Sequence, residues 1–378
     1  AALAARHIAM AVRLGDPAEV ALNEARAASL IVCDRGYLRH QVAWRKHVAE
    51  ATKVPVIQVE SDVVVPVAVV SDKAEYAART IRPKLKRHIE TYGQPLPELF
   101  VKKAAPLGLP SGEDLNDIDA LLAKLKVDTN VAPVTRFFKG GTSEAVARFE
   151  RFIEERLPHY DAHSNQPQTD DVSNMSPYLH FGQISPICLA HQINQAQTDT
   201  AGQANIDAYL EQLIVRRELA INFVSYRKDY DSYTVIPEWA RQSLAKHASD
   251  KRDPCYTLAQ LEKAKTHDDY WNAAMLEMVH TGFMHNYMRM YWGKKIIEWN
   301  PSPEEAFDRT LYLNNKYFLD GRDPNSYASI AWLYGVHDRG WPERPIFGKV
   351  RYMAASGLER KCDIKAYVRK INDRIRPS

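Results

Sequence analysis

HTGFMHNYMRMYWGKKIIEW, residues 280–299, is the stretch that decides how most of this chain is interpreted. The pattern predicts one helix that carries two tryptophans, three methionines and two histidines. Trp292 and Trp299 are seven residues, or two helical turns, apart, so both rings are expected on roughly one face, about 10 Å apart along the axis. Two interpretations stay open: such rings usually pack in a core, and they also suit stepwise electron transfer.

The helical pattern extends through nearly all of the chain from Thr142 onward. The segment before it, residues 83–141, is punctuated by prolines and glycines and is interpreted as a connector. The predicted helices lie near residues 143–157, 185–197, 203–227, 236–248, 257–265, 268–298, 302–318 and 325–335.

The N-terminal part alternates short apolar, β-branched runs with helical segments. The runs 29–34, 54–59 and 63–70 predict strands, and helices are expected at 17–28 and 36–51. Apolar strands alternating with helices are typical of a buried parallel sheet. No GxGxxG or P-loop motif supports nucleotide binding there.

The predicted fold is therefore a Rossmann-like α/β domain over residues 1–82, a linker over 83–141 and a larger all-helical domain over 142–378. The chain opens at Ala1 without a methionine and runs directly into a helix-like segment. A domain of this kind has at least one strand before that point, so we expect a truncated N-terminus.

Composition narrows the class of protein. The four cysteines form no CxxC pair, which argues against a disulfide framework or a cysteine-rich zinc site and fits a reducing compartment. No apolar run is long enough for a transmembrane helix. Hydrolase motifs of the GxSxG and HExxH types are missing, and the histidines lack metal-ligand spacing, so no metal is expected. The net charge is +3, but eleven Lys/Arg against four Asp/Glu between Arg339 and Arg376 suggest a polyanion partner, with a solvated charged surface as the alternative.

Three further features are candidates for chemistry. Trp271 is another large oxidisable ring, and Arg289 has a possible carboxylate partner in Asp320. Arg289 is equally compatible with a surface position. The polar stretch SNMSPYLHFGQIS, residues 173–185, leads into helix starts and is compatible with phosphate binding.

Together these motifs resemble the class II cyclobutane pyrimidine dimer photolyases, within the photolyase/cryptochrome superfamily. The resemblance spans nearly the whole chain and rests on SNMSPYLHFGQIS, EQLIVRREL, MHNYMRMYWGKKIIEW and LYLNNKYFLDGRDPNSYASIAW. It is also carried by residues 65–84 and 230–274.

The resemblance implies FAD, reduced and anionic in the active form, inside the helical domain. Tyr160, Ser173, Met175 and Ser176 match the positions that hold its phosphates and ribityl chain. The flavin-side matches are the ion pair Arg289 and Asp320, the asparagine Asn314 near the flavin N5, and the electron-transfer residues Trp271, Trp292 and Trp299.

The implied reaction is light-driven electron transfer to a pyrimidine dimer that is flipped out of DNA. Met290 and Trp332 match residues that touch the dimer, and Gln212 stands where the family has a glutamate that bonds it. Trp341 matches the residue that fills the gap left by the flipped bases. Asn165, Arg339, Lys349 and Arg351 are the remaining candidates for DNA contacts.

Departures from the family pattern concern the lesion pocket. Besides Gln212, Ser164 replaces an arginine, and Phe283 and Asn286 replace a lysine and a glycine. They motivate an alternative, a cryptochrome-like flavin photoreceptor with weak or no repair, and a third hypothesis is a DNA-binding fold without flavin. We expect a monomer without an obligatory protein partner, in the cytoplasm (at the nucleoid) or in a nucleus. An antenna pigment, a deazaflavin or a folate, is a further expectation for the α/β domain.

Overall fold

The computed structural model describes residues 2–97, 99, 112–196 and 202–376. The chain divides into two compact units, one of residues 1–61 with 95–130 and one of residues 62–94 with 131–378. Among the described residues, no helix is both long and apolar enough to span a bilayer. The domain boundaries after residues 82 and 141 stay predictions.

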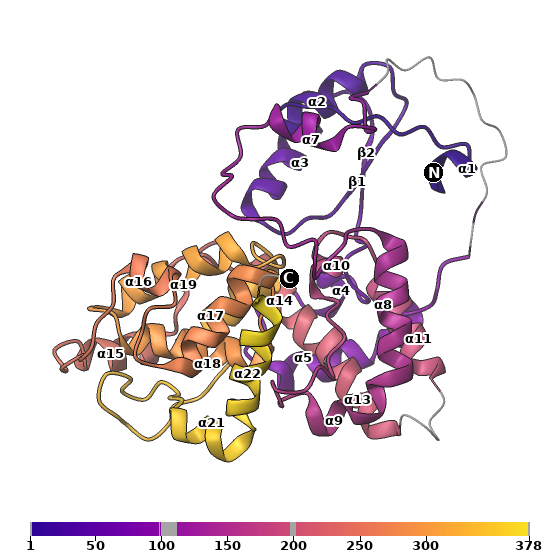
Figure 1. Ribbon diagram of the computed structural model, residues 1–378. Helices are drawn as coiled ribbons and strands as arrows, with labels where there is room; N and C mark the ends of the chain where they lie inside the picture. Colours follow the sequence, from indigo (N-terminus) through magenta and orange to yellow (C-terminus); the bar gives the residue numbers. More distant parts are fainter. Residues whose placement is uncertain (1, 98, 100–111, 197–201, 377–378) are drawn as a thin grey trace. The chain divides into compact units, whose positions relative to one another are not determined.

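The first unit is an α/β arrangement. Strands β1 (Ile31–Asp34) and β2 (Val56–Val59) pair in parallel with Ile31 opposite Val56, and α3 (Arg39–Ala51) forms the connection between them (Figure 1). The parallel pairing confirms the prediction for these two runs. The unit also contains α1 (Ala2–Ala5), α2 (Pro17–Ala25) and α7 (Ile118–Ala123).

The expectation of a buried sheet is wrong for these two strands. Val32 and Ile57 are 58% and 50% exposed. Neither of the two described strands is covered on both faces. Along β1, half-buried residues alternate with exposed ones, and in β2 only the first residue is half-buried while the other three are exposed. Apolar β-branched runs report strand propensity more reliably than they report burial.

The third predicted strand, 63–70, is also wrong. Residues Val67–Val70 form α4, which begins after Pro66. Val64 and Val65 precede it, and their backbone N–H groups donate to Oε1 of Glu218, at 2.7 and 3.3 Å. A carboxylate 154 residues away in the sequence therefore accepts the bonds that a neighbouring strand would have accepted.

The second unit is helical and has a continuous apolar core. The prediction of a large all-helical region is confirmed, although it missed two short helices, at 160–163 and 176–180, and the two helices from residue 355 onward. Between residues 78 and 210 its helices are α5 (Ala78–Lys86), α6 (Ile89–Tyr92), α8 (Thr142–Glu155), α9 (Tyr160–His163), α10 (Ser176–His180), α11 (Pro186–Gln195) and α13 (Gln203–Leu210). A π-helical turn (Glu211–Arg216) leads into α14 (Arg217–Tyr226), which is followed by α15 (Glu238–Lys246), α16 (Leu258–Glu262), α17 (Asp269–Thr281), α18 (Asn286–Glu298), α19 (Pro303–Tyr317), α20 (Pro324–Leu333), α21 (Ala355–Lys361) and α22 (Ile364–Ile375).

The single helix expected over 268–298 is broken into α17 and α18. Gly282 ends α17 with a left-handed φ of 69°. A Cβ there would lie 2.7 Å from Cγ of Leu319, so the position suits glycine for both backbone and space. His285 then caps α18, because its Nδ1 accepts from the backbone N–H of Tyr287 at 3.2 Å. The break changes the direction of the chain between α17 and α18, shortly before Arg289.

Two helix contacts matter for the site. Helix α18 packs against α17, α19 and α20. Helix α22 packs along α17 (Figure 1). Gly293 lets α18 approach α20 closely, because a Cβ there would collide with the Leu333 side chain. Residues from α17, α18, α19 and α20 are thereby brought together in one region of the helical unit.

Candidate functional site

The first feature of the site is a connected polar set. The guanidinium of Arg289 donates two hydrogen bonds to the carboxylate of Asp320, both at 3.0 Å. Ser326 Oγ donates to the backbone oxygen of Asp320 at 3.0 Å and accepts from Nδ2 of Asn314 at 3.0 Å. Arg289, Asp320 and Asn314, which were predicted to act together, are thus joined through one serine.

Local structure explains this arrangement. Arg289 lies in the first turn of α18, directly after the His285 cap, and its Nε also donates to the Met284 backbone oxygen at 2.9 Å. Asn314 lies near the end of α19, Asp320 lies in the turn that follows, and Ser326 lies in the first turn of α20. The ion pair is largely buried, with 20% and 11% of the side chains exposed, so the pair depends on its two-point geometry.

Phe318 connects this polar set to the tryptophans. The Arg289 guanidinium lies 3.9 Å from the centroid of the Phe318 ring. The same ring lies 6.2 Å from that of Trp292 in an edge arrangement. A cation over an aromatic face is attracted by its quadrupole. The Phe318 ring therefore packs against both the Arg289 guanidinium and the Trp292 indole.

The three predicted electron-transfer residues form one buried row. Trp271, Trp292 and Trp299 are 0%, 2% and 3% exposed. Trp271 is the middle member: its Nε1 donates to the backbone oxygen of Trp292 at 2.9 Å, and its ring lies 5.5 Å from that of Trp299. The indole Nε1 of Trp292 is buried and has no partner among the described residues.

Trp299 does not itself reach the surface. Tyr256 and His267 cover it, with ring centroids 5.3 and 5.4 Å away. His267 is exposed, and Tyr256 is half-buried. The role of Trp299 in electron transfer stays a prediction, and two further rings pack against its indole.

The loop expected to hold phosphates also has a defined geometry. Ser173 accepts a hydrogen bond from the Tyr209 hydroxyl at 3.3 Å, and the Tyr209 ring packs 5.4 Å from that of Tyr160. Burial raises the pKa of Tyr160 to about 12, so its hydroxyl stays protonated. Met175 is buried and Ser176 half-buried. The structure thus brings Tyr160 and Ser173 together through a tyrosine that the sequence did not single out.

The loop offers unused donors. Asn174 has a left-handed φ of 56°. In the described part of the chain, the backbone N–H groups of Ser173 and Asn174 donate to no protein acceptor. Free N–H groups at such a turn are suited to an anion.

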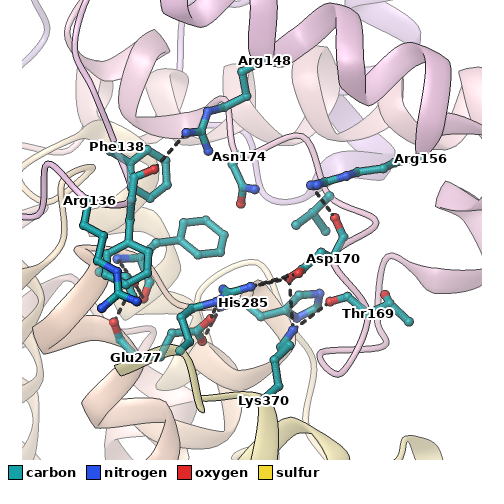
Figure 2. Close-up of a pocket in the computed structure, with 15 residues that line it drawn as sticks. Arg136, Phe138, Arg148, Arg156, Thr169, Asp170, Asn174, Glu277, His285 and Lys370 are labelled. Atoms are coloured by element: carbon teal, nitrogen blue, oxygen red, sulfur yellow. Dashed lines mark hydrogen bonds and ion pairs between the residues drawn. The ribbon is translucent and has the colours of Figure 1, made fainter. Parts of the chain in front are cut away.

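A basic pocket of about 250 Å³ lies beside this loop and is lined by Asn174 (Figure 2). Lys370 and Arg374 of α22 bind the Asp170 carboxylate, at 3.2 and 2.9 Å. Burial raises the pKa of Glu277 and lowers that of His285 to about 3, so His285 is neutral. This pocket was not predicted. Its cationic lining residues are Arg136, Arg148, Arg156, Lys370 and Arg374.

Two predicted lesion-side tryptophans lie in one cluster. The Arg351 guanidinium lies 5.3 Å from the ring centroid of Trp332 and 4.2 Å from that of Trp341. Two hydrogen bonds, of 2.9 and 3.1 Å, tie Arg351 to Asp338. Burial alone raises the pKa of Asp338, but the bonds from Arg351 bring it below its ordinary value. Arg351 is therefore held by a carboxylate between two indoles.

The other residues predicted to contact DNA or the lesion have fewer interactions with the rest of the site. Arg339, Lys349 and Asn165 are exposed, as phosphate contacts require. Met290 is half-buried on α18, and Gln212 is exposed in the π-helical turn, a type of turn that often marks functional sites. Within the described residues, no hydrogen bond joins Gln212 or Met290 to Trp332.

Ser326, Phe318, Asp338 and Lys294 were missed by the sequence interpretation. Ser326 and Phe318 carry no pattern that distinguishes them from other helix-end residues. Lys294 had a usable signal, since it lies between two tryptophans in a stretch that is rich in large apolar residues. It is 0% exposed.

Comparisons with known proteins place this geometry in context. The family model described as DNA photolyase matches residues 1–102. A deoxyribodipyrimidine photo-lyase of Methanothermobacter thermautotrophicus is 47% identical over 371 residues, covering 98% of this chain and 80% of the relative. One from Oryza sativa is 42% identical, covering 97% and 74%.

Solved structures agree on the fold. A class III photolyase from Agrobacterium tumefaciens superposes with a TM-score of 0.71 at 17% identity, covering 94% of this chain and 71% of its own. A cryptochrome from Synechocystis gives 0.67 at 14% identity, with 95% and 72% covered. The α/β-plus-helical fold class is confirmed.

Proposed function

The chain belongs to the DNA photolyase family, and from this premise we propose that it uses light to split cyclobutane pyrimidine dimers in DNA. Its activity is that of a carbon–carbon lyase, and its motifs favour class II. The observation that supports this most is the connected set Arg289, Asp320 and Asn314, which Phe318 joins to the buried indole of Trp292. An ion pair, an oriented amide and oxidisable rings suit electron transfer rather than hydrolysis.

Family membership implies a flavin, and the residues present fit FAD. The free N–H groups of Ser173 and Asn174 suit its phosphates, with Tyr160, Met175 and Ser176 around them. Arg289, Asp320 and Asn314 would hold the ring system. Bound reduced FAD supplies a donor of one electron upon absorbing light.

The protein groups have separate tasks in this proposal. Arg289 provides a positive charge that is fixed by two bonds to Asp320, so that negative charge nearby is stabilised without reorganisation. Asn314 presents an amide that can donate or accept, and the bond from its Nδ2 to Ser326 Oγ sets its orientation. Trp292, Trp271 and Trp299 form the proposed route that keeps the cofactor reduced.

The proposed substrate is DNA that carries a pyrimidine dimer. Trp332 is half-buried and offers an indole face on which a flipped pyrimidine stacks, with Met290 and Gln212 as further contacts. Trp341 would fill the gap in the duplex. Asn165, Arg339, Lys349 and Arg351 would contact the backbone. A monomeric state and an antenna pigment stay predictions.

Light-dependent repair tests the proposal. The purified protein, reduced and illuminated, should remove dimers from an irradiated oligonucleotide duplex, and an aliquot kept in the dark should not. The protein should be yellow and should bleach under light with a reductant. FAD-loaded protein without any light-dependent repair would refute the proposal and favour the cryptochrome-like alternative, which the exposed Gln212 in place of a glutamate supports.

A further inference from the structure

Lys294 is a buried cation that the proposed reaction does not use. It lies on α18, is 0% exposed, and donates through Nζ to the backbone oxygen of Leu333. Among the described residues, no carboxylate lies within ion-pair distance of it. Burying an ammonium without a carboxylate costs several kcal/mol, so an apolar residue would be the more stable occupant.

The position of Lys294 connects it to the lesion-side tryptophans. Leu333 is the last residue of α20, so its carbonyl is one that the helix leaves without an internal partner. A cation at this end is favourable. The preceding residue is Trp332, whose ring centroid lies 5.4 Å from Nζ of Lys294. One ammonium therefore fixes both the end of α20 and the indole beside it.

The contacts continue outward from Trp332. Arg351 lies within 5.3 Å of this ring and 4.2 Å of Trp341, and the exposed Arg339 lies 5.6 Å from Trp341. Cations and indoles alternate from the core to the surface in the order Lys294, Trp332, Arg351, Trp341, Arg339. We call this series the cation–indole ladder. Only its innermost member is fully buried.

We propose that Lys294 is a positioning residue for lesion recognition, because it anchors the cation–indole ladder and sets the Trp332 ring before DNA binds. This inference rests on the proposed function. A pre-set platform saves the cost of ordering Trp332 upon binding, and this benefit applies to a flipped dimer and not to an intact duplex. Removal of Lys294 should therefore weaken selectivity for damaged DNA.

Lys294→Met is the informative variant, because it keeps the length of the side chain and removes the charge. In the dark, the flavin-loaded protein is titrated against a duplex with one thymine dimer and against the same undamaged duplex. We expect the affinity ratio to fall about five- to tenfold, through loss of affinity for the damaged duplex. Undamaged-DNA binding should stay within about twofold, because that binding depends on backbone contacts.

Lys295→Met serves as a matched control. Lys295 lies on the same helix, and its Nζ pairs with Glu298 at 2.7 Å, away from Trp332. Its removal should leave the affinity ratio unchanged. At pH 7, a purely structural role for Lys294 predicts that the methionine variant is less stable than wild type, whereas a positioning role predicts equal or higher stability with poorer selectivity.

A pH titration of wild type adds a readout that needs no variant. Burial lowers the pKa of Lys294 to about 7; Asp338 opposes this shift, and Arg351 reinforces it. The affinity ratio of wild type should fall as pH rises from 6 to 8.5, and that of Lys294→Met should change less. An unchanged ratio in a folded Lys294→Met protein overturns the inference, and so does a variant that fails to fold. Wild type that does not prefer the damaged duplex overturns the proposed function instead.

Discussion

Replacing Asp320 with asparagine tests how strongly the flavin-side ion pair stabilises the helical unit. Asparagine preserves the shape of the side chain but replaces one of the two carboxylate oxygens with an NH₂ group. The guanidinium has only donors, so it can bond the one remaining oxygen, which is neutral, and cannot bond the NH₂ group. At least one of the two 3.0 Å hydrogen bonds is lost, and Arg289 keeps no carboxylate. Breaking a fully buried pair costs about 3–5 kcal/mol. With 20% and 11% of the side chains exposed, water offsets part of this, and we expect about 2–3 kcal/mol.

The assay is urea unfolding of the flavin-loaded protein, followed by far-UV circular dichroism and by release of the flavin. Asp373→Asn is the control, since it breaks a 3.3 Å pair with Arg376 whose side chains are 75% and 65% exposed. Exposed pairs contribute about 0–1 kcal/mol. Equal midpoints for the two variants, with equal denaturant slopes and full flavin retention, would show that the Arg289–Asp320 pair contributes little.

Three more outcomes are expected. Trp292→Phe should slow photoreduction of the flavin, measured by flash photolysis, yet leave repair by chemically pre-reduced protein largely intact. Equal loss of photoreduction and repair would show that the Trp292 ring has only a structural role. Wild type should gain stability relative to Lys294→Met as pH rises from about 7 to about 10, by up to about 1.4 kcal/mol per pH unit, because the unfolded chain binds the proton that native Lys294 has lost. If the difference between their unfolding free energies did not change with pH over this window, the pKa of Lys294 would not be lowered in the native protein. Gly282→Ala should destabilise the protein by about 1–3 kcal/mol, since alanine is strained at φ 69° and meets Leu319; a thermal midpoint equal to wild type would argue against the helix break.

Much of the fold could be predicted because its signals are local. Helix starts with Ser or Asp caps, such as Ser185 before α11 and Ser302 before α19, fell within one or two residues of their predicted positions. The parallel pairing of β1 and β2 followed from two short apolar runs separated by a helix. The third run failed because the partner of Val64 and Val65 is a carboxylate on α14, which no local pattern reveals.

The candidate site was predicted in its members and not in its connections. Arg289, Asp320, Asn314 and the three tryptophans were named from motifs. That Ser326 joins Asn314 to Asp320, and that Trp271 is the middle indole, depends on how α17, α18, α19 and α20 pack.

The sequence by itself determined the class of fold, the family and the identity of the chemistry-bearing side chains, because residue types and their spacing are written along the chain. Only the tertiary structure decided what each side chain meets. The stretch 280–299 shows the difference. Its composition indicates aromatic rings and cations, but the turn at Gly282 sets the direction of the helix that carries Arg289, and packing of that helix against α20 buries Lys294. Burial and hydrogen-bond partners come from segments far apart in sequence, and these set which groups are charged, oriented or exposed.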